Sequence, residues 1–141
     1  MTSMNVIPFF SPTKQPLPYV TSYISAGFPS PADDHVDQTL DLHEYLVKHP
    51  AATFFVRVEG ESMTGAGIFH GDLLVVDRSL TARDGSIVIA VVNGELTVKR
   101  LRKEKTMIRL VAENPAYTPI VITEETELVI WGVVTSVIHH V

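Results

Sequence analysis

The sequence contains no cysteine among its 141 residues. Disulfide bonds, thiolate metal sites and a cysteine nucleophile are therefore excluded, and the composition suits a reducing compartment. Apolar runs of roughly 20 residues, which a membrane-spanning helix needs, are also lacking. A secretory signal is disfavoured because the N-terminal region has no early basic cluster and prolines interrupt its apolar stretches. We therefore expect a cytoplasmic protein without membrane contact.

Basic charge is scarce as well. Lysine and arginine number 11 against 16 aspartates and glutamates, which gives a formal net charge of −5. General nucleic-acid binders usually carry a basic excess, so direct sequence-specific DNA binding is not expected. The densest basic run, residues 99–105 (KRLRKEK), is interrupted by Leu101 and Glu104. Its outer members Arg102, Lys103 and Lys105 indicate a solvated strand end.

Histidines and aspartates do not form a convincing metal or triad pattern. The histidines are scattered along the chain and fit surface positions better than zinc ligands: His35, His43, His49, His70, His139 and His140. Asp72, Asp77 and Asp84 stand at expected turns or strand ends, where structural roles are the more common ones. No metal and no cofactor are predicted.

The first 31 residues differ from the rest in composition. They hold six of the nine prolines, and Lys14 is their only charged residue. Proline fixes φ and lacks a backbone N–H, so this segment is predicted to be an extended, poorly paired and mobile arm. Its apolar side chains favour reversible docking on a surface: Phe9, Phe10, Tyr19, Val20, Tyr23 and Ile24.

The remainder is typical of an all-β domain with one short helix. Residues 41–49 predict the helix, with Asp41 as N-cap, Glu44 in a capping-box position and Pro50 as the stop. Apolar runs bounded by turn residues predict strands over residues 53–59, 72–77, 87–92, 95–101, 106–112 and 127–138. Asn93-Gly94 indicates a two-residue hairpin between two of these strands. Short strands of this spacing favour a barrel-like or sandwich-like arrangement.

Ser62 follows a predicted strand at a glycine-flanked turn, residues 59–65 (EGESMTG). Such a turn exposes a hydroxyl and leaves backbone N–H groups free to bind an oxyanion. A serine there is, on its own, more often the cap of a helical turn than a nucleophile. Its function therefore depends on a partner base.

Lys99 is the candidate base. Strand alternation places Thr97, Lys99 and Leu101 on one face of the hairpin's return strand. A lysine on an edge strand is usually solvated and charged, with a pKa near 10.4. Burial lowers the pKa of a lysine, and neutral Lys99 could then take the Ser62 proton without a histidine. Thr97 could orient the amine, although ordinary β-propensity also explains a threonine there.

Several segments together resemble the LexA/UmuD family of self-cleaving Ser-Lys proteases. The strongest matches are residues 58–63 (VEGESM), 71–77 (GDLLVVD) and 94–101 (GELTVKRL), supported by 27–31 (GFPSP), 41–42, 49–50, 114–117 (NPAY) and 119–120. The resemblance runs from about Gly27 to the C-terminus. It implies a compact LexA-type protease domain over residues 27–141 and a cleavable arm over residues 1–26.

The resemblance also implies roles for individual residues. Ser62 would be the nucleophile, Lys99 the general base and Ala26-Gly27 the scissile bond. The backbone N–H groups of Ser62 and Glu61 would form the oxyanion hole. Two neighbours would support the site: Thr97 and Met63.

The family's biology implies an SOS-response protein of mutagenic DNA repair. RecA filaments on single-stranded DNA would stimulate cleavage, and the shortened homodimer would serve a UmuC-type translesion DNA polymerase. The arm is too short for a repressor's DNA-binding domain, which favours the UmuD branch. Two alternatives stay open: a non-enzymatic β-domain that only binds partners, and the protease domain of a LexA-like repressor. A stable product beginning at Gly27 separates the first from a protease, and operator binding would indicate the second.

Overall fold

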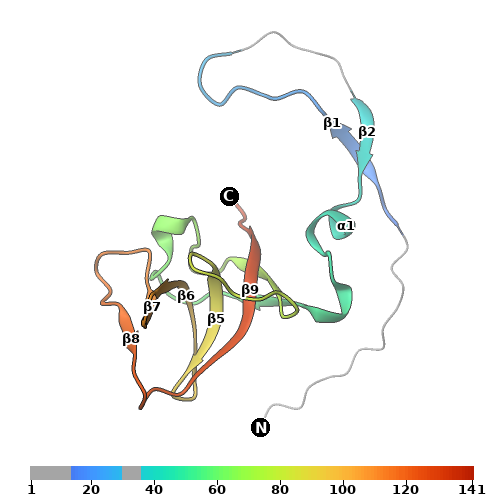
Figure 1. The fold of residues 1–141 in the computed structure, drawn as a ribbon. Helices are drawn as coiled ribbons and strands as arrows, with labels where there is room; N and C mark the ends of the chain where they lie inside the picture. The colour runs from blue at the N-terminus through green and yellow to red at the C-terminus, as the bar shows by residue number, and fades with distance from the viewer. Residues whose placement is uncertain (1–13, 30–35) are drawn as a thin grey trace. The chain divides into compact units, whose positions relative to one another are not determined.

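The computed structural model describes residues 14–29 and 36–141 (Figure 1). Contacts divide the chain into two compact units, Met1–Tyr45 and Leu46–Val141. Phe9 and Phe10, two of the apolar side chains predicted to let the arm dock, lie outside the described residues.

The N-terminal unit contains a strand pair that the proline content did not predict. Strand β1, Leu17–Val20, runs antiparallel to β2, Val36–Leu40, with Tyr19 opposite Gln38. The expectation of an extended segment is confirmed, but the expectation of poor pairing is wrong for these four residues. A two-stranded ribbon tolerates Pro18 because half of each strand's N–H groups point away from the partner.

Helix α1, Leu42–Leu46, is shorter than the predicted helix over residues 41–49. Its start is as expected, because the Asp41 carboxylate accepts the Glu44 backbone N–H at 3.2 Å. This hydrogen bond holds the pKa of Asp41 below its ordinary value. Its end comes early because Pro50, which opens the 3₁₀ helix Pro50–Ala52, disfavours helical geometry at His49, whose ψ is 83°.

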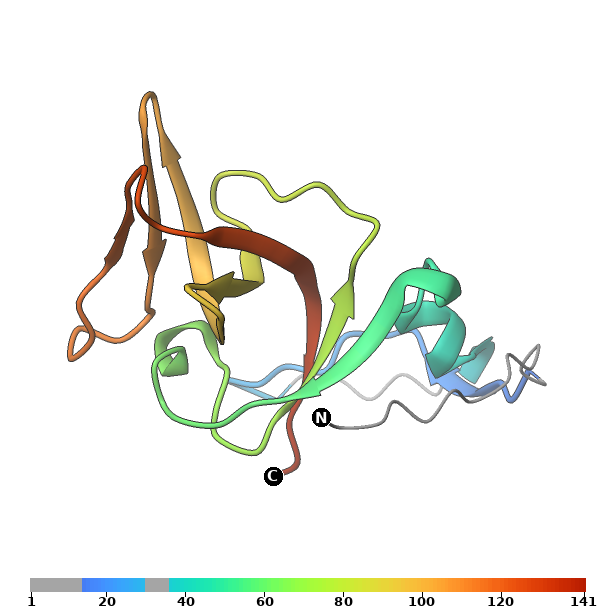
Figure 2. The same ribbon diagram turned by 90° about the horizontal axis from the view of Figure 1, so that it is seen from below.

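Within Leu46–Val141 the described strands form one antiparallel sheet of seven, in the order β3-β4-β9-β5-β6-β7-β8. Their bounds are β3 Thr53–Arg57, β4 Leu73–Asp77, β5 Ile87–Val92, β6 Glu95–Glu104, β7 Met107–Val111, β8 Ile120–Ile122 and β9 Leu128–Ile138. The sheet is strongly twisted and curved (Figure 2). The predicted all-β class is confirmed, and three-residue β8 is the only strand of this sheet that was not predicted.

The curved sheet has a hydrophobic cluster on each face. One contains Val58, Met63, Ile68, Leu74, Val76 and Ile89. The other contains Val88, Ala90, Leu101 and Leu110. Strand β5 supplies side chains to both clusters, because successive residues of a strand point to opposite faces. Its continuous apolar sequence is therefore explained by burial on both sides.

Gly132 on β9 has no room for a side chain. A Cβ at this position would lie 2.5 Å from Val76 Cγ1 and 3.3 Å from Arg78 Cγ. We expect Gly132→Ala to lower the free energy of unfolding by about 1–3 kcal/mol through overpacking. Thermal or urea unfolding measures this effect. Val129→Thr, an isosteric change at an exposed position of the same strand, should stay within about 0.5 kcal/mol of the parent. Equal stability of all three proteins would contradict the prediction.

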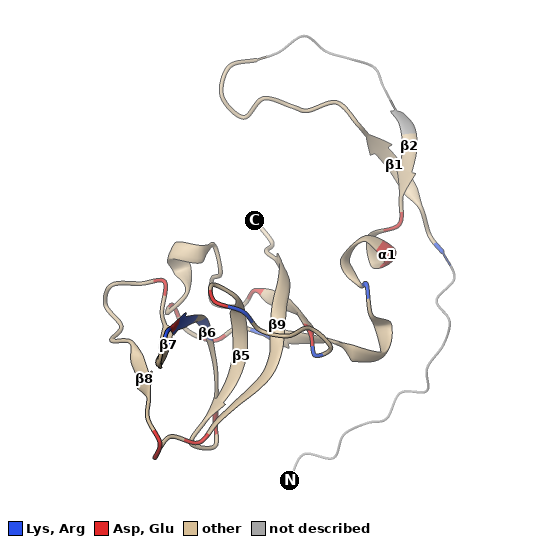
Figure 3. Ribbon diagram, in the orientation of Figure 1, with Lys and Arg blue, Asp and Glu red and all other residues tan. Residues whose placement is uncertain are grey.

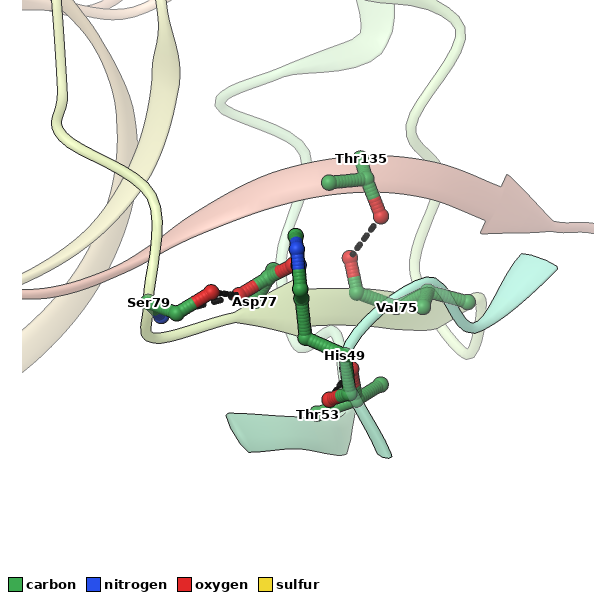
Figure 4. A network of polar contacts seen from close by, with 6 residues as sticks. All are labelled: His49, Thr53, Val75, Asp77, Ser79 and Thr135. Carbon is green, nitrogen blue, oxygen red and sulfur yellow. Dashed lines mark hydrogen bonds and ion pairs between the residues drawn. The ribbon is translucent and has the colours of Figure 1, made fainter. Parts of the chain in front are cut away.

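Two buried aspartates tie strand ends to histidines. Asp77, at the end of β4, accepts hydrogen bonds from Ser79 and from His49 Nδ1, the latter at 2.5 Å (Figure 4). Asp72 accepts the Phe69 N–H and a hydrogen bond from His139. Burial raises the pKa of both carboxyl groups, but the hydrogen bonds outweigh it, so each pKa lies below its ordinary value. The structural role predicted for these aspartates is confirmed.

Candidate active site

Ser62 stands in the turn that follows β3. Gly60 adopts φ = +90°, which a glycine tolerates without strain and which turns the chain out of the strand direction. After the serine, the Met63 side chain is 1% exposed, and its carbonyl accepts the N–H groups of Ala66 and Ile68. Met63 thus anchors the turn in the core while Ser62 stays partly exposed.

Lys99 reaches the serine from β6. Its Nζ lies 3.1 Å from Ser62 Oγ, 2.8 Å from Thr97 Oγ1 and 3.1 Å from the Val98 carbonyl oxygen. The structure therefore brings Ser62, Lys99 and Thr97 together, although 37 residues separate Ser62 from Lys99.

The lysine sits in partly desolvated surroundings. Burial lowers the pKa of Lys99 below the ordinary value for lysine. Among the ion pairs of the described residues, none involves this amine. Because burial disfavours the ammonium form, the neutral amine of Lys99 is more accessible than that of an exposed lysine.

A groove of about 550 Å³ opens beside the two side chains. Ser62 and Lys99 line it together with β3, the turn after β3, and β6. Its apolar wall includes Leu74, Ile89, Leu96, Tyr117 and Trp131. Sequence reasoning did not identify Leu96, Tyr117 or Trp131 as site residues, since they come from β6, the loop between β7 and β8, and β9. The groove has room for an extended peptide with small or apolar side chains.

The backbone around Ser62 leaves two donors for a negative oxygen. Among the backbone hydrogen bonds of the described residues outside helices and strands, none uses the N–H of Glu61 or of Ser62.

The expected scissile bond, Ala26-Gly27, belongs to the N-terminal unit, where both residues are exposed in an irregular segment. A side chain added at Gly27 would meet nothing within 4 Å.

The basic side chains of β6 and β7, blue in Figure 3, are partly paired with acidic ones. Arg100 makes a short ion pair with Glu113, and Arg109 on β7 pairs with Glu104. Lys103 and Lys105 are exposed, as expected for a strand end, while Arg102 is half-buried.

In the described part of the chain no group of three or more potential ligands is arranged to hold a metal ion. No helix there is long and apolar enough to cross a membrane.

Comparison with known proteins identifies the class. Residues 18–135 match the Peptidase S24-like family, and the chain belongs to it. The predicted membership of the LexA/UmuD group of self-cleaving peptidases is confirmed. The chain is 50% identical to Protein MucA of Escherichia coli over 127 residues, which is 88% of this chain and 86% of MucA. It is 48% identical to Protein SamA of Salmonella typhimurium, covering 95% and 93% of the two chains. LexA repressor 1 of Pseudomonas putida is 42% identical over 82% of this chain but only 57% of the repressor.

Proposed function

We propose that the chain is a serine endopeptidase that cuts its own Ala26-Gly27 bond, with Ser62 as nucleophile and Lys99 as general base. The observation that supports this most directly is the 3.1 Å contact between Lys99 Nζ and Ser62 Oγ at the edge of a groove. Membership of a self-cleaving peptidase family agrees with it.

The three neighbours of Lys99 Nζ explain how the lysine acts as a base. An ammonium group has three N–H donors, which match the three acceptors around it. The neutral amine keeps two, and these remain with Thr97 Oγ1 and the Val98 carbonyl. Its lone pair then points at Ser62, ready to accept the hydroxyl proton. Thr97 is thus a positioning residue for the amine.

The reaction proceeds in two steps, acylation of Ser62 and hydrolysis of the resulting ester. Ser62 Oγ bonds to the Ala26 carbonyl carbon while its proton moves to Lys99, and the N–H groups of Ser62 and Glu61 stabilise the oxyanion. Lys99 gives that proton to the Gly27 nitrogen as the peptide bond breaks, which leaves an ester between Ala26 and Ser62. Lys99 then takes a proton from water as the water oxygen attacks the ester carbonyl carbon, and it returns this proton to Ser62 Oγ as the ester bond breaks. Ala26 leaves as a carboxylic acid, which ionises by losing its proton to solvent.

The biological role follows from the family resemblance. We propose that RecA filaments on single-stranded DNA stimulate this cleavage in the SOS response. Residues 1–26 leave as the cleaved arm, and residues 27–141 remain as a homodimer. The shortened dimer acts as an accessory subunit of a UmuC-type translesion polymerase.

Mass spectrometry of the purified protein, with and without RecA, ATP and single-stranded DNA, tests the proposal. A product that begins at Gly27 is expected, and it should form faster with the filament. A protein that stays intact under both conditions would support the alternative of a non-enzymatic binding domain. A product with another N-terminus would refute the scissile bond but not the peptidase.

Spontaneous cleavage should accelerate with pH. Lys99 acts as a base only when it is deprotonated, so the cleavage rate should rise as the pH passes through its pKa. Because burial lowers this pKa, the rate should reach its plateau at a lower pH than the one at which an exposed lysine titrates. Single-turnover rates between about pH 6 and pH 10 measure the profile. Circular dichroism at each pH shows whether the protein remains folded. A flat profile in folded protein would exclude Lys99 as the titrating base.

A further inference from the structure

The loop after β7 holds the turn that carries Ser62. Asn114 Nδ2 donates a hydrogen bond to the Glu61 carbonyl oxygen at 2.9 Å, across 53 residues of sequence. The Gly65 N–H donates to the Glu113 carbonyl oxygen at 2.7 Å. The serine turn is therefore fastened to this loop on both sides of Ser62.

The loop itself is braced. Asn114 Oδ1 accepts the Ala116 N–H at 3.0 Å, which fixes the orientation of its amide. The Glu113 side chain pairs with Arg100, which also donates to the Gly85 carbonyl oxygen at 2.6 Å. Arg100 directly follows Lys99 on β6, so the loop contacts both the turn that carries Ser62 and the strand that carries Lys99. Asn114 is half-buried, and the two hydrogen bonds of its amide hold it in one orientation.

The contact at Glu61 has a specific geometric consequence. The Glu61 carbonyl and the Ser62 N–H belong to the same peptide group, and in a planar trans peptide they point in opposite directions. A donor that holds the carbonyl oxygen on one side therefore fixes the direction of the N–H on the other. The same hydrogen bond polarises the peptide group and makes its N–H a stronger donor.

We propose that Asn114 is a positioning residue that orients the Ser62 N–H for the oxyanion, an inference that rests on the proposed self-cleavage. Asn114 does not touch the reacting atoms. It prevents rotation of the peptide between Glu61 and Ser62, and so keeps the oxyanion donor in place before the substrate arrives. Preorganised donors of this kind supply much of the catalysis in acyl transfer.

The variant Asn114→Asp tests this positioning role most directly. It keeps the oxygen that accepts the Ala116 N–H but replaces the donor to Glu61 with a second acceptor, which repels the carbonyl oxygen. Asn93→Asp is the matched control, because Asn93 also uses Oδ1, to accept the Glu127 N–H, and gains the same charge outside the groove lining. Asn114→Ser is a neutral second variant whose short hydroxyl does not reach Glu61.

The cleavage rate is compared on the high-pH plateau, where Lys99 is neutral in every variant. We expect Asn114→Asp and Asn114→Ser to lower the plateau by about 10- to 100-fold, less than loss of an oxyanion donor itself. Asn114→Ser should leave the midpoint of the pH profile in place, since Lys99 is untouched. Plateau rates within twofold of Asn93→Asp would overturn the proposal, as would a plateau loss explained by unfolding at the assay temperature.

A second measurement does not depend on cleavage. The ¹⁵N shift of the Ser62 amide responds to the hydrogen bond on the preceding carbonyl, so it should move upfield in Asn114→Asp and stay in place in Asn93→Asp. An unchanged Ser62 signal in Asn114→Asp would refute the positioning role. If the parent protein cleaved nothing, the proposed function would fail, whereas the NMR result would still decide what Asn114 does.

Discussion

Replacing Ser62 or Lys99 with alanine should stop self-cleavage, with a loss of about 10³-fold or more. In the proposed reaction Ser62 forms the covalent ester and Lys99 carries the proton in both directions, so each substitution removes a group that the reaction needs. The protein is incubated at raised pH, and the fraction cut at Gly27 is followed by mass spectrometry.

Lys99→Arg should fail as completely as Lys99→Ala. Arginine keeps the positive charge and the hydrogen-bonding capacity, but its guanidinium stays protonated and cannot act as a base. Lys103→Ala, at an exposed position of the same strand, is the control and should cleave at the parental rate. Cleavage by Lys99→Arg would rule out the lysine as base, and cleavage by Ser62→Ala would rule out the serine as nucleophile.

These variants should remain folded. Burial lowers the pKa of Lys99, so the folded state disfavours the ammonium form. A lysine whose folded pKa lies below its unfolded pKa reduces stability at neutral pH, and this cost disappears as the pH rises above the unfolded value. Removing the amine therefore relieves a cost while it loses three hydrogen bonds. Thermal unfolding should show an intact cooperative transition.

A chain that begins at Gly27 should support lesion bypass with a UmuC-type polymerase without RecA, whereas uncleavable Ser62→Ala should not. The reason lies in the apolar arm, in which Tyr23 is fully exposed and Ile24 is 86% exposed. Docked on apolar surface, a few such side chains would gain roughly 25 cal/mol per Å² buried, enough for a reversible cover while the arm is tethered. Cleavage after Ala26 removes the tether permanently.

Bypass of a template lesion by the purified polymerase compares the two proteins directly. Blocking the cut from the substrate side should have the same result as Ser62→Ala, so Gly27→Glu and Ala26→Trp should be inactive in both cleavage and bypass. Ser25→Ala keeps a small side chain beside the bond and should behave as the parent. Equal bypass by the chain beginning at Gly27 and by Ser62→Ala would show that the arm is not a switch.

Elements defined by local signals were predicted best. Strand β5 has the predicted bounds, because residues 87–92 are uniformly apolar and Asn93-Gly94 follows at once. In the structure Asn93 and Gly94 both have positive φ, 48° and 84°, as the tight hairpin requires. Strand β1 was missed because its partner β2 lies some 20 residues further on, and proline content argued against pairing.

In the candidate site, too, features with a local sequence signal were predicted and contacts between distant residues, apart from that of Ser62 with Lys99, were not. The shared face of Thr97 and Lys99 follows from strand alternation. The pairing of Lys99 with Ser62 was a hypothesis from the residue types, and the family resemblance implied the same pair. The contact of Asn114 with Glu61 and that of His49 with Asp77 cross 53 and 28 residues. Neither has a local signal, since an asparagine or histidine in a loop fits many surroundings. Only the completed sheet brings these partners together.

The strand order has a consequence for how the protein is made. Ser62 follows β3 and Lys99 lies on β6, and in the sheet β4, β9 and β5 stand between these two strands. Strand β9 follows all the others in the chain, so a ribosome synthesises it after both reactive residues. A nascent chain without β9 lacks the strand that joins β4 to β5, although the loop after β7 can still contact the serine turn. If the chain cuts itself as proposed, we expect full cleavage activity only after the last strand has entered the middle of the sheet.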